Sequence, residues 1–224
     1  SNILHYVAKN NIGHLVFPSC STIYQSSTVP VRENDFDMNK AFFKTYSGSA
    51  NVKAYVEQIC RVYSEILNTK FTILRHSNLY GPYDKYFRDD SHVCASLISK
   101  VLKASDGDTL EIWGDGKLQR DLLFTEDFCE AIKLILTSQP EKFNIYNVGS
   151  AKLISIDELA YAIMKESKKI LKVSHKPLSA TSNFTSCLNI DKFQSHYNWT
   201  PKTSLQLGLR YSIACISSQN NRAD

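Results

Sequence analysis

Glycine is scarce in this chain, with eight glycines among 224 residues. No two of them have the G-x-G-x-x-G spacing between a strand and a helix. That spacing lets backbone N–H groups and a helix N-terminus meet a pyrophosphate. The sequence therefore lacks a glycine-rich turn of this type, and any nucleotide site has to be argued from other residues.

Metal-ligand and membrane signals are also missing. Six cysteines occur, but none forms a CxxC pair or a Cys/His cluster with metal-ligand spacing, so we expect no metal site. Their scatter favours a reduced, cytoplasmic setting over a disulfide framework. No apolar run is long enough to cross a bilayer, and no signal peptide opens the chain, so we expect no membrane partner.

The charge balance is mild. The chain has 26 Lys and Arg against 22 Asp and Glu, a formal net charge of +4. This excess is too weak and too scattered to predict nucleic-acid binding, although it suits a small anionic ligand. Length and composition are those of a globular protein with one core, or with one core and a small lobe.

Hydrophobic patterns in the first half alternate between helix and strand. Residues 1–9 and 50–68 have helical periodicity, whereas residues 14–18 and 71–76 are short apolar runs typical of buried strands. A polar stretch over most of 25–45 predicts a loop. This order predicts a parallel α/β sheet.

The second half is more mixed. Ser155 and Glu158 form a capping box, Ser first and Glu three residues later, that predicts a helix start. The expected helices are 92–104, 125–137, 155–169 and 204–216, and the expected strands are 109–113, 121–124 and 144–148. The fold class is therefore α/β.

Three segments carry a family resemblance. Residues 78–85 (NLYGPYDK) lead to Ser-His-Val at 91–93, residues 113–116 (WGDG) precede Arg120-Asp121, and Asn-Trp-Thr-Pro ends the pattern at 198–201. In this order they resemble the extended short-chain dehydrogenase/reductase family (NAD-dependent epimerase/dehydratase), most of all its GDP-fucose synthases. The resemblance implies a Rossmann-type sheet whose glycine-rich N-terminal segment is missing here.

The same resemblance implies two domains. Residues 1–82 would be the remainder of the dinucleotide-binding domain. Residues 83–224 would be mainly a mixed α/β substrate-binding lobe, with Rossmann elements interleaved at about 119–150. The implied cofactor is NADP, and the implied partner is a nucleotide sugar, a GDP-linked deoxyhexose. A homodimer through residues 50–68 is a further implication.

The family uses a Tyr to move a proton during hydride transfer and a Lys one helical turn later to support it. Counting without gaps places Lys53 on the family Lys, as a catalytic and cofactor-binding residue, but Ser49 on the family Tyr. Tyr46 lies one turn upstream and is the alternative. Reading Tyr46 as the motif Tyr puts Ala50 where Lys belongs, so neither alignment supplies both residues.

The segment before Tyr24 departs from the family as well. Cys20 stands at the usual catalytic Ser/Thr position, with Ser21 beside it. Thr22, a substrate-binding position by the resemblance, stands where the fucose synthases have their Cys base, so that base is missing unless Cys20 takes its place. Cys20 could act as a base if its thiol were activated, or it could be an inert buried thiol. Ser19 falls at a cofactor-binding position.

The remaining site residues follow from the three segments. His92 matches the family's proton-donating His, a role that suits an imidazole, and also lies at a cofactor-binding position. Cations near a diphosphate and an aromatic ring near a base make physical sense. The resemblance assigns Asn78 and Leu79 to the cofactor, and Asn78, Lys100, Trp113 and Arg120 to the nucleotide-sugar substrate.

Three functions stay open at this point. The first is an NADP-dependent epimerase/reductase that acts on a GDP-linked 4-keto-6-deoxy sugar. The second is a catalytically inactive or truncated sugar-nucleotide-binding homologue, which the altered Tyr, Ser and Cys positions favour. The third is another family activity, a 4-epimerase or a 4,6-dehydratase, against which the segment 91–93 argues.

Overall fold

The computed structural model describes residues 2–138, 141–177 and 184–220. Its main sheet is parallel, with strand order β1-β3-β7. The strands are β1 (His14–Cys20), β3 (Lys70–His76) and β7 (Phe143–Val148). The middle strand β3 is buried throughout its apolar run, as expected for a parallel strand covered on both faces.

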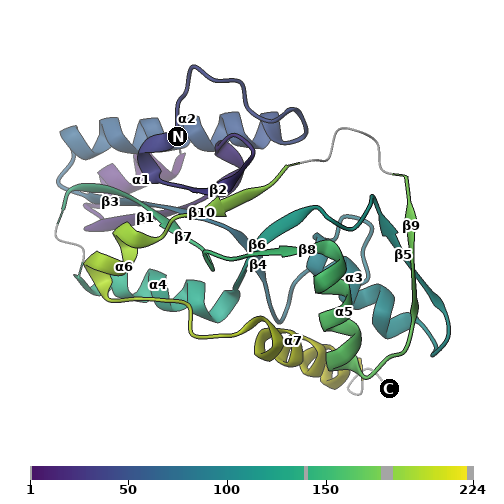
Figure 1. The fold of residues 1–224 in the computed structure, drawn as a ribbon. Helices are drawn as coiled ribbons and strands as arrows, with labels where there is room; N and C mark the ends of the chain where they lie inside the picture. The colour runs from purple at the N-terminus through teal and green to yellow at the C-terminus, as the bar shows by residue number, and fades with distance from the viewer. Residues whose placement is uncertain (1, 139–140, 178–183, 221–224) are drawn as a thin grey trace.

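Helices cover both faces of this sheet (Figure 1). On one face lie α1 (Asn2–Lys9) and α2 (Ser47–Ile66), whose apolar side chains share a core with β1 and β3. On the other face lie α4 (Thr125–Ser138) and α6 (Asp191–Tyr197). The predicted helix–strand alternation and the parallel sheet are therefore confirmed.

A second lobe follows the main sheet. Its small sheet contains β4 (Asn78–Tyr80), β6 (Gln119–Phe124) and β8 (Leu153–Ser155). Three helices share a core with this sheet. They are α3 (Val93–Lys103), α5 (Ile156–Ser167) and α7 (Leu205–Asn220). The short strands β5 (Thr109–Trp113) and β9 (Lys172–Lys176) pair in parallel at the far end of the lobe.

The capping box predicted at the start of α5 is present. The backbone N–H of Glu158 donates to Ser155 Oγ at 3.2 Å, and the backbone N–H of Ser155 donates to Glu158 Oε2 at 2.8 Å. Two N–H groups that the helix cannot satisfy itself thus find partners. The helix begins at the residue after Ser155, as the sequence predicts.

The prediction of a loop over 25–45 is wrong in part. β2 (Ser27–Val31) lies in this stretch and pairs with β10 (Ser186–Leu188), and short 3-10 segments occupy 33–35 and 44–46. The pairing joins residues more than 150 positions apart, which no local pattern reveals. It holds the polar segment between β1 and α2 against β10.

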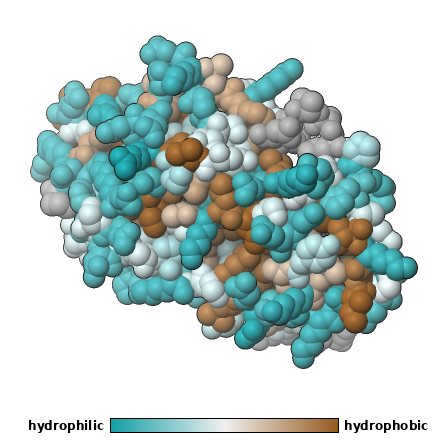
Figure 2. Space-filling view, viewed as in Figure 1, coloured by the Kyte–Doolittle hydropathy of each residue, from teal (hydrophilic) through white to brown (hydrophobic). Residues whose placement is uncertain are grey.

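A hollow of about 820 Å³ lies between the α5–β8 side of the second lobe and the segment that leads into α7. On the face seen in Figure 2, apolar side chains gather between the hydrophilic surfaces of the two lobes. The residues that line this hollow include none of the site residues predicted from the sequence. The candidate site has to be sought elsewhere, at the strand ends of the main sheet.

Candidate active site at the strand ends

The carboxyl ends of β1 and β3 bring the first site residues together. Cys20 and His76 are paired positions of the two strands, and both terminate their strands. Ligands of open parallel α/β sheets bind outside these strand ends. His76 was not predicted from the sequence, although its place two residues before Asn78 could have signalled it.

Lys53 reaches this strand end from the second turn of α2. Its Nζ donates a hydrogen bond to the backbone oxygen of Pro18 at 3.0 Å and lies 5.7 Å from the ring centre of Phe17. Burial lowers the pKa of His76, and the nearby Lys53 ammonium lowers it further, against a hydrogen bond to Ser77 that raises it. Lys53 therefore presents a cation at the β1 and β3 ends.

Cys20 and Thr22 lie in direct contact, with Sγ and Oγ1 2.7 Å apart. Both side chains are half-buried at the start of the 3-10 segment after β1. Ser19 and Ser21 are buried, and Ser19 Oγ has no hydrogen-bond partner among the described residues. In the family that this chain resembles, the hydroxyl comes first along the chain and the thiol second. Here the order is reversed, and the two groups lie in contact.

Tyr46 and Ser49 have different surroundings. The Tyr46 ring packs edge-on against Phe184 with centres 5.2 Å apart, and its hydroxyl lies near the guanidinium of Arg120. Ser49 is exposed, and its hydroxyl donates to the backbone oxygen of Tyr46 at 3.0 Å inside the first turn of α2. Tyr46 therefore faces the second lobe, while Lys53 faces the β1 end.

Arg120 is a partly buried cation without an acidic partner. Its Nη1 donates to the backbone oxygens of Gln119 at 2.9 Å and Phe184 at 2.5 Å. No carboxylate of the described residues forms an ion pair with it, and burial lowers its pKa. An uncompensated buried charge is unfavourable, so this side chain is suited to an anionic ligand.

Asn78 joins β4 to β6 within the second lobe, next to this cluster. It is exposed, and its Nδ2 donates to the backbone oxygen of Asp121 at 3.0 Å; Leu79 beside it is half-buried. The carboxylate of Asp121 is buried and accepts bonds from Ser150 and from the backbone of Leu188. Burial raises the pKa of Asp121, and these hydrogen bonds oppose that rise. Asp121 therefore fixes the frame on which Asn78 sits.

The other predicted residues lie on the second lobe. The His92 side chain is 70% exposed, with Nδ1 3.4 Å from Asp84 Oδ1. Lys100 Nζ donates to the backbone oxygen of Glu111 at 3.2 Å. Trp113 is 61% exposed at the end of β5 and lines a cavity of about 450 Å³. Among the described residues, none of these three side chains contacts Lys53, so only a ligand could bring them together with it.

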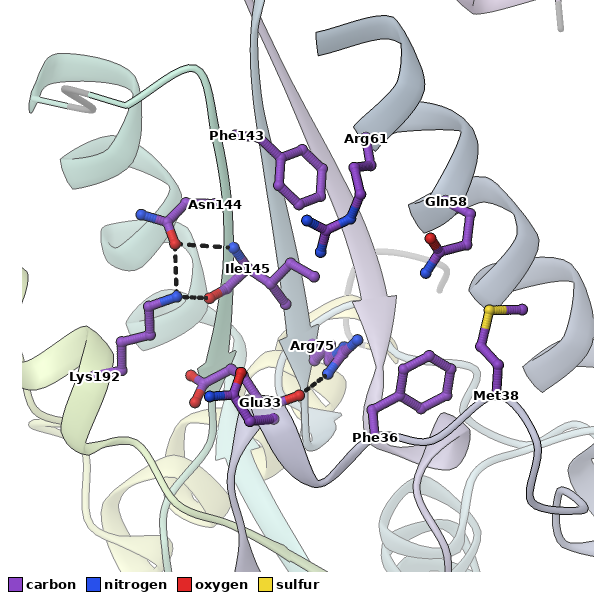
Figure 3. A pocket seen from close by; sticks show the side chains of 11 residues that line it. Glu33, Phe36, Met38, Gln58, Arg61, Arg75, Phe143, Asn144, Ile145 and Lys192 are labelled. Atoms are coloured by element: carbon purple, nitrogen blue, oxygen red, sulfur yellow. Dashed lines mark hydrogen bonds between the residues drawn. The ribbon is translucent and has the colours of Figure 1, made fainter. Parts of the chain in front are cut away.

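A cavity of about 540 Å³ on the α2 side of the main sheet is a different feature (Figure 3). Arg75 lines it and forms a buried ion pair with Glu57, 2.7 Å away. Arg75 Nη1 also donates to Tyr24 Oη and to the backbone oxygen of Glu33. Because these groups satisfy one another, the network ties the segment after β1 to the sheet and serves the fold.

Metal and membrane features are absent from the described part of the chain. All six cysteines are free. Among the described residues no group of His, Cys, Asp and Glu could hold a metal ion, and no helix is long and apolar enough to span a bilayer. The site consists of hydroxyl, thiol, imidazole and cationic side chains at the ends of parallel strands.

These features define an α/β protein with a Rossmann-type sheet and a candidate site at its strand ends. Residues 1–149 match the sequence profile of the NAD dependent epimerase/dehydratase family, and the chain belongs to that family. It is 31% identical over 97% of its length to a GDP-L-fucose synthase of Sinorhizobium fredii, of which it spans 69%. It is 30% identical to a dTDP-4-dehydro-6-deoxy-D-allose reductase of a Streptomyces species, of which it spans 62%.

Solved structures agree on the fold. A UDP-glucose 4-epimerase of Thermotoga maritima, with UDP-glucose, matches 97% of the chain with a TM-score of 0.85 at 20% identity, and the chain covers 68% of it. A UDP-glucose 4-epimerase of Thermus thermophilus, in complex with NAD, matches 96% of the chain with a TM-score of 0.80 at 26% identity, again with 68% covered. The predicted family and fold class are thereby confirmed.

Proposed function

We propose that this chain is the nucleotide-sugar-binding and catalytic part of an NADP-dependent epimerase/reductase for a GDP-linked 4-keto-6-deoxy sugar. The observation that carries the proposal is Arg120, a partly buried guanidinium bonded only to uncharged oxygens. A diphosphate supplies the missing negative charge through charge-assisted hydrogen bonds. The exposed ring of Trp113 offers a surface on which a base can stack.

The residues at the strand ends suit the proton and binding steps. The family's nicotinamide cofactor supplies a hydride when bound. Lys53 is placed to contact its ribose, with Ser19, Asn78, Leu79 and His92 at further cofactor positions. Tyr46 is the stronger candidate for the proton donor to the sugar oxygen, because a phenol is far more acidic than the hydroxyl of Ser49.

The epimerisation steps need an acid and a base beside the keto group. His92 is the proposed acid because its imidazole is exposed and an imidazole is a common proton donor in enzymes. Cys20, with Thr22 in contact and Ser21 next to it, is the proposed source of the base. Lys100 and Arg120 would hold the diphosphate. The GDP preference rests on the fucose synthases among the relatives.

An inactive sugar-nucleotide-binding protein is the second candidate. The observation in its favour is that Ser49 stands one turn before Lys53, while Tyr46 faces Arg120 instead. Such a protein would bind the nucleotide sugar through Arg120 without turnover. The other family activities are 4-epimerisation and 4,6-dehydration. Solved structures of a UDP-glucose 4-epimerase and a dTDP-glucose 4,6-dehydratase have a similar fold.

Calorimetric titration with GDP tests the binding part of the proposal. The wild-type chain should bind GDP, and Arg120→Met should weaken binding roughly 10- to 100-fold because a hydrogen-bonded charge is lost. The matched control is Arg210→Met, which removes an exposed guanidinium paired with Glu166 and should leave the affinity unchanged. Equal affinity of wild type and Arg120→Met for GDP would contradict the assignment, and tighter UDP or dTDP binding would contradict the preference for GDP.

The same proposal includes a homodimer through α2. Four of its apolar side chains stay exposed on one face: Val52 at 63%, Tyr55 at 63%, Val62 at 56% and Ile66 at 69%. Ile3 and Tyr6 of the neighbouring α1 are exposed to a similar degree. A row of large apolar side chains at helical spacing is typical of an interface.

A further inference from the structure

The loop between β4 and α3 is held in an unusual conformation. Tyr83 and Phe87 have positive φ angles of 68° and 58°, which side chains other than glycine rarely adopt. The hydroxyl of Tyr86 donates to the backbone oxygen of Gly81 at 2.8 Å, and the backbone N–H of Phe87 donates to Ser99 Oγ at 2.9 Å. Backbone strain of this kind persists where the surroundings fix the loop, often beside functional groups.

The carboxylate of Asp84 sits inside this loop with spare acceptor capacity. Its side chain is 14% exposed, and Oδ1 accepts the backbone N–H of Lys85 at 2.7 Å. Oδ2 is buried and has no hydrogen-bond partner in the part of the chain that the structure describes. After burial itself, the charge of Asp84 helps to raise the pKa of Cys94. A buried carboxylate oxygen without a donor calls for a nearby cation or donor.

His92 is the imidazole next to this carboxylate, on the side of Oδ1. Its Nδ1 lies 3.4 Å from Asp84 Oδ1. His92 also precedes α3 as its N-cap, but the imidazole makes no capping hydrogen bond, so the helix does not use it. The two cations of the loop, Lys85 and Arg88, are paired with Asp90 instead. His92 is therefore the basic side chain of this loop that contacts Asp84 among the described residues.

We propose that Asp84 is a positioning residue for His92. It accepts the Nδ1–H of the imidazole, fixes that tautomer and leaves Nε2 for the substrate, as carboxylates do for histidines elsewhere. The inference rests on the proposed function, from which the acid role of His92 comes. In the proton step the Nε2–H bond of the imidazolium breaks and a C–H bond forms at the enolate carbon beside the keto group. Neutral His92, still protonated on Nδ1, regains its proton from water.

The tautomer of His92 tests the proposal on the chain as it exists. Two-dimensional NMR of ¹⁵N-histidine-labelled protein, recorded at a pH at which imidazole is neutral, distinguishes Nδ1–H from Nε2–H. The signal that disappears in His92→Gln belongs to His92. We expect Nδ1–H in the wild type and loss of that preference in Asp84→Ala. Asp90→Ala, from the same loop, should leave the tautomer unchanged. An Nε2–H signal in the wild type, or an unchanged tautomer in Asp84→Ala, would overturn the inference.

Hydrogen exchange from solvent gives the functional readout and needs no reduced cofactor. In D₂O, the wild-type chain should incorporate deuterium at the carbons beside the keto group of the GDP-linked sugar. His92→Gln should slow this by roughly 10²- to 10⁴-fold, the usual share of a general acid. Asp84→Ala should slow it by about 10-fold or more, as loss of a supporting partner does, and the double variant should be no slower than His92→Gln.

The tautomer and the deuterium uptake together distinguish failure of the proposed epimerisation from failure of the proposed role of Asp84. If the wild type takes up no deuterium, the proposed epimerisation fails, while the tautomer still decides the role of Asp84. If His92→Gln slows exchange and Asp84→Ala does not, Asp84 is not a positioning residue. If Asp84→Ala loses its folded NMR spectrum, Asp84→Leu replaces it because it fills similar space without an acceptor, and full exchange in Asp84→Leu with an unchanged tautomer overturns the inference.

Discussion

Tyr46 and Ser49 are three residues apart, yet their hydroxyl groups have different roles open to them. The Ser49 hydroxyl donates a hydrogen bond to the backbone in the first turn of α2, whereas the Tyr46 hydroxyl lies near the guanidinium of Arg120. The surroundings of the two side chains therefore favour Tyr46 as the proton donor.

Substitution at the two positions tests this choice. Tyr46→Phe should lower the rate of sugar reduction by about 10²-fold or more, because the proton donor is removed and the ring is kept. Ser49→Ala should change the rate less than about threefold, since it removes only a local backbone contact. Steady-state rates of NADPH consumption measure both. The reverse pattern would support the gapless alignment, in which Ser49 replaces the family Tyr.

Some site residues were within reach of the sequence and others were not. Cys20 and Thr22 are two positions apart at the end of a predicted strand, so their contact follows from local chain order. The partner of Arg120 is Phe184, 64 positions away, and no local pattern announces it. His76 escaped because it carries no motif of its own and becomes a site residue only through its pairing with Cys20.

The elements show the same division. Long segments with clear periodicity, such as α2 and α4, were predicted within a few residues of their observed ends. The strands β4 and β10 have three residues each and exist through distant partners. β9 was missed because its sequence KVSHK is mostly polar and its pairing with β5 supplies what the pattern lacks.

The exposed face of α2 makes a prediction at this scale. The double variant Val62→Glu, Ile66→Glu should convert a dimer into a monomer, because it places charges in an apolar contact about three turns away from Lys53. Sedimentation velocity measures the change. Val29→Glu, at a side chain 70% exposed on β2, is the control and should leave the dimer intact. A monomeric wild type, or a dimer that survives the double variant, would contradict the interface.

The two lobes are joined where Asp121 of β6 accepts the backbone N–H of Leu188 in β10, the strand that pairs with β2. Tyr46 and Arg120 contact each other across this junction, while Lys53 stays with the main sheet. β1 stands at one end of the strand order of the main sheet, and the chain spans 69% of the fucose synthase that it resembles. The proposed reaction thus depends on groups from both lobes meeting over one ligand.

The most direct measurement is consumption of NADPH by the purified chain in the presence of a GDP-linked 4-keto-6-deoxy sugar. The absorbance of the reduced nicotinamide should fall, with one reduced sugar formed for each NADPH consumed. Lys53→Met should lower this rate at least about 100-fold, since it removes the cation at the strand ends. Binding of the sugar nucleotide without any loss of NADPH would contradict the account and establish the chain as a binding homologue.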